Sequence, residues 1–197
     1  MRIVVVGATG TIGREIVKAL QPEHEIVPVN RHSTAIKADI ADPSSLRAMY
    51  KAIGRADAVI CAAGEARRKP LAELTDDDFA ISLRSKLMGQ VNLVRYGLDH
   101  VSDGGSFTLT SGVLARQPIP GSEALTLVNA GVEGFVRAAA LEMPRHQRVN
   151  IVSPPWVNET LQQLNMKGIL GLPAAVVARA YVNAVLGKEN GQVIEPR

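Results

Sequence analysis

The feature that most constrains the fold is a glycine-rich turn, GATGTIG at residues 7–13, because of the two segments that flank it. Residues 2–6 form a short run rich in β-branched side chains, which is typical of a strand. Residues 14–20 place apolar side chains at helical spacing. The order strand, tight turn, helix is the opening unit of a parallel α/β sheet.

The three glycines of this turn have distinct physical roles. Gly7 permits a tight bend, Gly10 lets the backbone approach a pyrophosphate, and Gly13 lets the helix pack closely on the strand. The anion would then lie on the N-terminus of the helix. We therefore expect a dinucleotide to contact the turn at Gly7, Thr9, Gly10, Thr11, Ile12 and Gly13. A turn that is rich in glycine but binds nothing is the alternative.

Strand and helix patterns alternate along the whole chain. Strands are predicted near residues 2–7, 25–29, 35–39, 57–62, 105–110, 147–152 and 192–195. Helices are predicted near residues 11–20, 44–53, 76–99, 123–143 and 173–186, with a short helical turn near 159–166. This alternation predicts an α/β fold with a doubly wound, parallel, seven-stranded sheet and helices on both faces. With 197 residues and 46% hydrophobic side chains, we expect residues 1–197 to form a single domain.

Composition argues against several classes of function. A net charge of +3 and 4% aromatic residues give no indication of nucleic-acid binding. No apolar stretch approaches the roughly 20 residues that span a bilayer, and the histidines show no metal-ligand spacing. The single cysteine, Cys61, lies in an apolar run and is interpreted as a buried hydrophobe. We expect a cytoplasmic protein without a metal. The one basic cluster, residues 67–69, is either a solvated loop or a rim that attracts an anionic cofactor or substrate.

The segment after the second predicted strand indicates which dinucleotide binds. An acidic residue at this position reads the ribose 2′-hydroxyl of NAD, whereas an arginine accommodates the 2′-phosphate of NADP. Here the candidates are Asn30, Arg31 and Ser33, with His32 beside them, and no acid is present. We therefore expect NADP(H) to be preferred over NAD(H), by about ten- to hundredfold for one charge-assisted hydrogen bond. An ordinary exposed arginine in a turn is the alternative.

Further motifs follow the glycine turn in a characteristic order. The motifs are the strand end at Asp39, Ala62-Ala63-Gly64, Ser111-Gly112, AGVEGF at residues 130–135 and NIVSPP at residues 150–155. With these motifs in this order, the chain resembles the short-chain dehydrogenase/reductase family over nearly its whole length.

The resemblance implies a Rossmann fold, a nicotinamide dinucleotide and a homo-oligomer. It places the adenine edge against Asp39 and its neighbour Ile40. It also implies that Ala62, Ala63 and Gly64 line the central crevice, and that Val157 and Thr160 lie near the nicotinamide carboxamide. Small residues in the helix at 123–143 favour close helix approach in the oligomer.

The usual Asn–Ser–Tyr–Lys tetrad of the family is largely replaced. Alignment on residues 130–135 puts Leu125 at the tyrosine position and Asn129 at the lysine position, and an ungapped count puts Lys86 at the asparagine position. Only Ser111 is retained. One hypothesis is that Asn and Lys have exchanged places, so that Lys86 approaches the ribose or donates the proton. The other interpretation is that Lys86 and Asn129 are incidental replacements after the chemistry was lost.

The segment that normally builds the substrate lid is short, residues 156–172, and predicts a small or open pocket.

The motifs leave three hypotheses for the function. The chain is an atypical NADP(H)-dependent oxidoreductase acting on a carbonyl or alcohol, a non-catalytic NADP(H)-binding sensor, or a scaffold without cofactor. Loss of a positioned general acid costs about 10²–10⁴ in rate, so weak reductase activity is compatible with the missing tyrosine.

Overall fold

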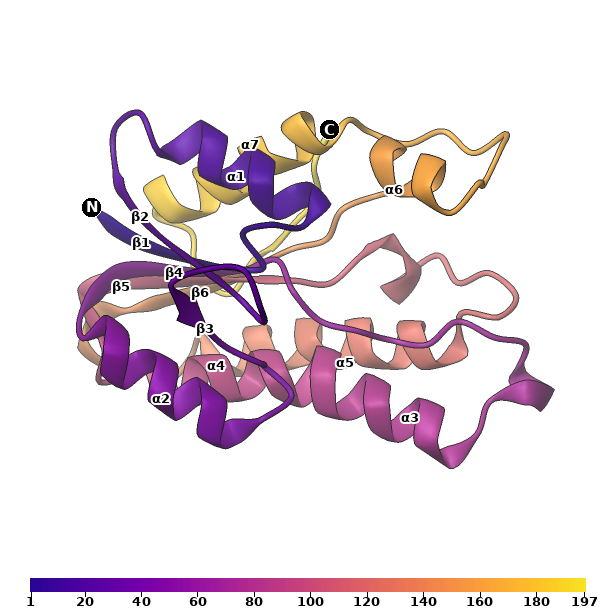
Figure 1. Ribbon diagram of the computed structural model, residues 1–197, viewed down its shortest axis with the longest axis horizontal. Helices are drawn as coiled ribbons and strands as arrows, with labels where there is room; N and C mark the ends of the chain where they lie inside the picture. The colour runs from indigo at the N-terminus through magenta and orange to yellow at the C-terminus, as the bar shows by residue number, and fades with distance from the viewer.

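The computed structural model describes residues 1–197 and contains one seven-stranded sheet in which all neighbouring strands are parallel (Figure 1). The strand order is β3-β2-β1-β4-β5-β6-β7. The strands are β1 (Arg2–Val6), β2 (Glu25–Asn30), β3 (Ile36–Lys37), β4 (Ala56–Cys61), β5 (Val101–Thr110), β6 (Arg148–Val152) and β7 (Val193–Ile194). The predicted parallel sheet is confirmed.

Helices cover both faces of the sheet. Figure 1 shows α1 (Thr11–Leu20) and α7 (Ala174–Leu186) on one face, and α2 (Pro43–Ile53), α4 (Gly89–Gly97) and α5 (Glu123–Ala139) on the other. The shorter elements are α3 (Asp76–Ser82), α6 (Asn158–Gln163) and the 3-10 turns η1 (Leu71–Glu73), η3 (Val113–Ala115) and η4 (Pro144–His146). No helix combines the length and apolarity needed to cross a membrane.

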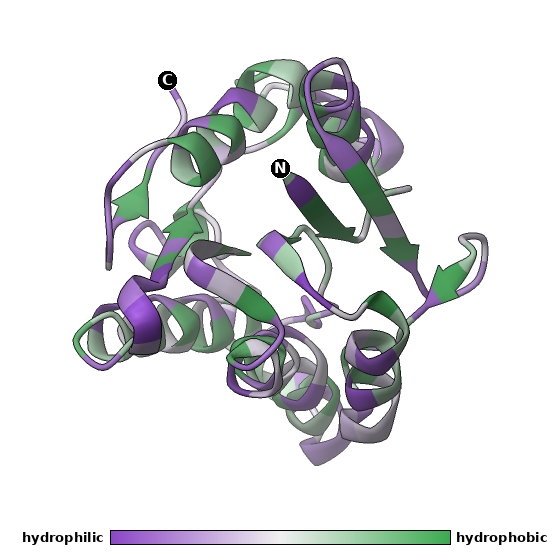
Figure 2. Ribbon diagram, turned by 90° about the vertical axis from the view of Figure 1, so that its left-hand side faces the viewer, coloured by the Kyte–Doolittle hydropathy of each residue, from purple (hydrophilic) through white to green (hydrophobic).

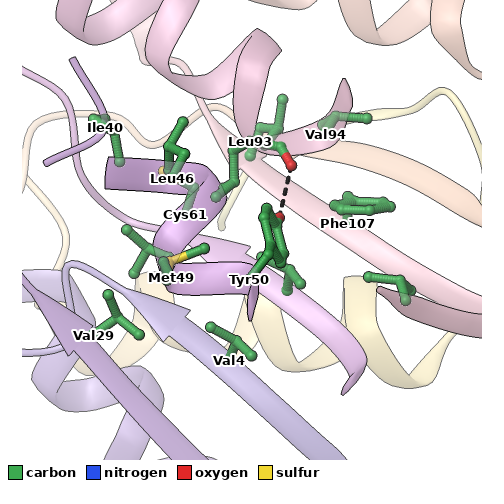
Figure 3. Close-up of a cluster of buried hydrophobic side chains, with 14 of the residues drawn as sticks. Val4, Val29, Ile40, Leu46, Met49, Tyr50, Cys61, Leu93, Val94 and Phe107 are labelled. Carbon is green, nitrogen blue, oxygen red and sulfur yellow. Dashed lines mark hydrogen bonds between the residues drawn. The ribbon is translucent and has the colours of Figure 1, made fainter. Parts of the chain in front are cut away.

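The core consists of two buried clusters, one on each side of the sheet. Figure 2 shows that the strands between the helices are largely hydrophobic, as expected for a sheet covered on both faces. In the cluster beneath α2 and α4, the Tyr50 hydroxyl donates a hydrogen bond to the Leu93 carbonyl at 2.6 Å (Figure 3). This bond satisfies the one polar atom of a side chain that is otherwise fully buried.

The strand order determines where a ligand can bind. From β1 the chain first builds outward through β2 and β3, and then returns to add β4 on the other side of β1. Ligands of such sheets bind beyond the carboxyl ends of the strands at this switch point. The glycine turn follows β1 and residues 62–64 follow β4, so both predicted segments lie at this place.

The helix predicted at 76–99 is present from Asp76 to Gly97, but its middle is a π-helix. The structure divides it into α3, the π-helix η2 (Leu83–Met88) and α4. Periodicity cannot indicate the extra residue in a π turn, and such turns are frequent at functional sites. The helix predicted to end at residue 143 ends at Ala139, and Met143 has extended backbone because a proline follows it. The strand predicted from residue 105 starts at Val101, and the third strand is only two residues long.

Candidate functional site

The glycine turn is built as its sequence predicts. Gly7 has a φ of +86°, and a Cβ there would lie 2.7 Å from the carbonyl oxygen of Ala62. A Cβ on Gly13 would collide with the carbonyl group of Gly7. A Cβ on Gly10 would have a single neighbour, the Gly7 carbonyl oxygen at 3.3 Å. Gly7 and Gly13 are therefore required by the fold, whereas Gly10 has a single close neighbour and otherwise borders space that a ligand can occupy.

The N-terminus of α1 provides free hydrogen-bond donors beside that space. No side chain caps this helix, and its first turn contains no acidic residue. The first intrahelical bond is donated by the Arg14 amide to Gly10, so the amides of Thr11, Ile12 and Gly13 have no helical acceptor. Free amides and the helix dipole together favour an anion, and this geometry fits the pyrophosphate of a dinucleotide.

A cavity of about 340 Å³, here called the cofactor cavity, lies over the turn. Most of the predicted cofactor residues line it. These are Gly7, Thr9, Gly10, Asn30, Arg31, Ile40, Ala62, Ala63 and Gly64. His32 and Ser85 also line it, and Ser85 was not identified from the sequence. Seven predicted cofactor residues are absent from its wall. Val157 and Thr160 line a second cavity instead, and Thr11, Ile12, Gly13, Ser33 and Asp39 line neither.

Asn30 organises the loop after β2. Its side-chain amide donates to Thr9 Oγ1 at 2.5 Å and to Ser33 Oγ at 2.7 Å, and its Oδ1 accepts from the backbone amides of His32 and Ser33. These four bonds use the full capacity of the side chain. Asn30 therefore shapes the loop, and Arg31 and His32 are left at the cavity wall. Arg31 forms a loose ion pair with Asp39, with 3.6 Å between Nε and Oδ2.

A second cavity of about 160 Å³, here called the substrate cavity, adjoins the first. Gly64 of the cofactor cavity has a φ of +136°, and a Cβ there would lie 2.8 Å from Cδ of Lys86. The substrate cavity brings together the residues at all four tetrad positions and the two predicted nicotinamide contacts. They are Lys86, Ser111, Leu125, Asn129, Val157 and Thr160, together with Trp156 of the lid segment and Pro155 directly before it.

Lys86 is the charged side chain of this cavity. It lies in the π-helix η2, and it forms no ion pair. Burial lowers the pKa of its ammonium group to about 8, and the neighbouring Cys61 thiol opposes this shift only in part. A lysine with such a pKa can give and regain a proton near neutral pH.

Gln90, which the sequence analysis missed, fixes the position of η2. Its side-chain Nε2 donates to the carbonyl oxygens of Lys86 at 3.0 Å and Thr110 at 2.9 Å, and its Oε1 accepts from the Thr110 amide at 2.8 Å. The helix segment is thus tied to the end of β5, directly before Ser111. A signal existed in the sequence, because Gln90 shares helical spacing with the buried Leu93 and Gly97.

Ser111 and Asn129 differ in how their polar atoms are satisfied. The Ser111 hydroxyl donates to the buried carboxylate of Glu133 at 2.8 Å. Arg116 Nη1 donates to both oxygens of that carboxylate, each at 3.0 Å. Asn129 Oδ1 is buried without a hydrogen-bond partner. An orphaned acceptor in this cavity fits a hydroxyl donor of a ligand, such as the ribose of a nicotinamide nucleotide.

Comparison with known proteins gives consistent matches. The sequence profile of a family described as enoyl-(acyl carrier protein) reductase matches residues 5–192. Hydroxynaphthalene reductase arp2 of Aspergillus fumigatus is 28% identical over 164 residues, which cover 81% of this chain and 58% of that protein. The chain thus spans little more than half the length of the curated relatives it matches first, at 58% and 55%.

Solved structures match over nearly the full chain. The protein lin1944 from Listeria innocua is 39% identical, has a TM-score of 0.96, and is matched over 99% of this chain and 98% of that one. A small-chain dehydrogenase in complex with NADPH is 25% identical, has a TM-score of 0.85, and is matched over 99% and 95%. The family profile, these relatives and the observed sheet together show that the chain belongs to the short-chain dehydrogenase/reductase family.

Proposed function

We propose that the protein is an NADP(H)-dependent oxidoreductase of this family that acts on a carbonyl or alcohol group with altered catalytic residues. One observation carries the proposal. A cavity with the features of a dinucleotide site adjoins a smaller cavity in which Lys86, Ser111 and Asn129 are brought together from three separate elements. The polar groups needed for hydride transfer to a carbonyl are therefore next to the expected position of the nicotinamide.

The loop after β2 supports the proposed preference for NADP(H), which carries a 2′-phosphate, over NAD(H). Arg31 and His32 line the cofactor cavity, and the acid that would read a free 2′-hydroxyl is absent from the end of β2. Asp39 faces the Arg31 guanidinium, so a 2′-phosphate here would compete with a loose, exposed ion pair of small energy. A relative at 25% identity is a complex with NADPH. We expect NADPH to bind about tenfold or more tightly than NADH.

Lys86 is the proposed proton donor. When bound, the reduced nicotinamide supplies a hydride to the carbonyl carbon of the substrate. As the π electrons of the C=O bond move onto the oxygen, the Lys86 ammonium gives that oxygen a proton and becomes a neutral amine, which solvent protonates again. Asn129 Oδ1 accepts a hydrogen bond from the ribose. Ser111 Oγ accepts a hydrogen bond from the hydroxyl of the alcohol product, because its own hydrogen is directed to Glu133.

A non-catalytic NADP(H)-binding protein is the second candidate, and one feature favours it. Leu125 has no proton to give at the position where the family has tyrosine, and the hydroxyl of the retained Ser111 donates its hydrogen bond to Glu133. In that case a protein partner would recognise the cofactor-bound form, and no substrate would be converted.

The two candidates are separated by binding and turnover measured on the same samples. Calorimetric titration with NADPH and with NADH, repeated with Arg31→Ala, tests the cofactor site. A tenfold preference for NADPH that is lost in the variant supports it, and binding of neither nucleotide refutes both candidates. NADPH oxidation with a panel of carbonyl compounds, slowed at least a hundredfold by Lys86→Met, supports the enzyme. NADPH binding without any turnover supports the sensor.

We also propose a homo-oligomer built on α5. Leu127, Ala130 and Ala138 are exposed on this helix, and a Cβ on Gly134 would meet no atom. Gly131, another small residue of this helix, faces Leu87 of its own chain instead. Light scattering tests the oligomer, and a monomer at micromolar concentration would refute it.

A further inference from the structure

The basic loop after β4 contains one cation that has no acidic partner. Arg67 pairs with Glu65 at 2.8 Å and lies 3.8 Å from Asp78, and Lys69 pairs with Asp78 at 2.8 Å. The guanidinium of Arg68 forms no ion pair with any residue of the chain. Two of the three charges in this cluster are therefore neutralised within the loop, and the third is available to a ligand.

Arg68 reaches the lid segment, residues 156–172. Its guanidinium carbon lies 5.9 Å from the centroid of the Trp156 ring, and its Nη1 donates to Met166 Sδ at 3.4 Å. In Figure 1 the loop after β4 and the lid segment extend at the same end of the molecule. A thioether is a weak acceptor and an aromatic face takes no conventional hydrogen bond, so most of the five N–H donors of Arg68 are unused.

Arg68 does not itself line the substrate cavity, but Trp156, which it contacts, lines that cavity together with Lys86. The cavity wall contains no carboxylate, and its one charged side chain is positive. Glu123 shares a neighbouring cavity with Arg68 and Lys69 but pairs with neither. The field along the wall from Lys86 to the lid therefore favours a negatively charged ligand.

We propose that the substrate is a small oxo acid, with its carboxylate held by Arg68 at the lid and its carbonyl directed to Lys86. This inference rests on the proposed function. A planar guanidinium binds a carboxylate through two parallel hydrogen bonds, and this geometry discriminates against uncharged analogues. The substrate cavity has a volume of about 160 Å³ and includes the predicted nicotinamide contacts, so the space left for a substrate favours a short acyl chain over a fused-ring compound.

Trp156 provides a test that does not depend on turnover, because it is the only tryptophan of the chain. The complex with NADP⁺ is titrated with pyruvate, acetoacetate and levulinate, and with the methyl ester of each, while tryptophan fluorescence is recorded. We expect at least one acid to give a saturable change at a concentration about tenfold or more below that of its ester. Arg68→Gln is expected to remove the difference. Lys167→Gln, which removes an exposed lid charge next to Met166, is the matched control and is expected to retain it.

Each result has a defined meaning. Equal affinities for acid and ester, no response to any acid, or an unchanged preference in Arg68→Gln overturns the oxo-acid proposal. Acid binding that depends on Arg68 without NADPH oxidation supports the anion site and refutes the catalytic function. Where turnover occurs, Arg68→Gln is expected to raise KM for the acid about tenfold and leave kcat within a factor of about two, because the guanidinium binds a group that does not react.

Discussion

The carbonyl oxygen of Gly7 occupies the space that a Cβ atom on Gly13 would need, whereas a Cβ on Gly10 would lie 3.3 Å from that same oxygen and meet no other atom. Two glycines of one motif thus meet different demands within this molecule. Gly13 allows α1 to pack against the backbone of the turn, and Gly10 leaves space for a ligand at the N-terminus of that helix.

Alanine substitutions should separate these two roles. Gly13→Ala forces the backbone of the turn apart and is expected to lower the free energy of unfolding by about 3 kcal/mol or more, as in severe overpacking. Gly10→Ala places alanine at an N-cap with extended backbone, so stability should change by less than about 1 kcal/mol. NADPH affinity should nevertheless fall at least tenfold. Urea denaturation and calorimetry measure the two effects, and tight NADPH binding by Gly10→Ala would contradict the assignment.

The buried Glu133 carboxylate couples Ser111 to Arg116. Glu133→Gln keeps an acceptor for the Ser111 hydroxyl but removes the charge that holds Arg116, so we expect a loss of about 2 kcal/mol in unfolding free energy. Arg137→Gln is the matched control. Its guanidinium is more exposed and lies 3.9 Å from the same carboxylate, so its loss should cost about 0.5 kcal/mol or less. Equal losses in both variants in urea denaturation would show that the contact of Glu133 with Arg116 stabilises the fold no more than its contact with Arg137.

Much of the site could be predicted from the sequence, because local patterns determine it. The glycine turn, residues 62–64 and Ser111 each follow a strand, and parallel strands bring their carboxyl ends to one edge. The π-helix could not be predicted, since it depends on the contact of Gln90 with Thr110 across the helix–sheet interface. The scaffolding role of Asn30 was missed for a related reason. Its bond to Thr9 joins loops that are 21 residues apart.

The buried Lys86 should make stability depend on pH. Its pKa is about 8 in the folded chain and 10.5 when unperturbed, so between these values the unfolded chain binds more protons and stability rises with pH. Below pH 8 the charge is present in both states, and its burial costs the folded protein about 3 kcal/mol at ~1.4 kcal/mol per pKa unit.

Lys86→Met should therefore be more stable than the wild type at pH 7. The difference between their free energies of unfolding, here called the gap, should narrow as pH rises from 8 to 10.5. Cys61 and Tyr181 also have raised pKa values through burial, but they are present in both proteins and largely cancel in the difference. Urea denaturation across this pH range measures the gap. A gap that does not change with pH would show that Lys86 is not desolvated.

Gln90 should be as important for stability as a core residue, although it is polar. Gln90→Leu retains the side-chain volume but leaves the Thr110 amide, the Thr110 carbonyl and the Lys86 carbonyl without this partner. An unsatisfied buried group costs about 1–3 kcal/mol, so we expect a loss of about 3 kcal/mol or more, with faster hydrogen exchange at the Thr110 amide. Gln162→Leu, the same change at an exposed position of α6, should cost less than about 0.5 kcal/mol. Slow exchange at the Thr110 amide in Gln90→Leu would mean that the end of β5 stays ordered without the glutamine. The position of Lys86 would then be determined by the packing of η2 alone.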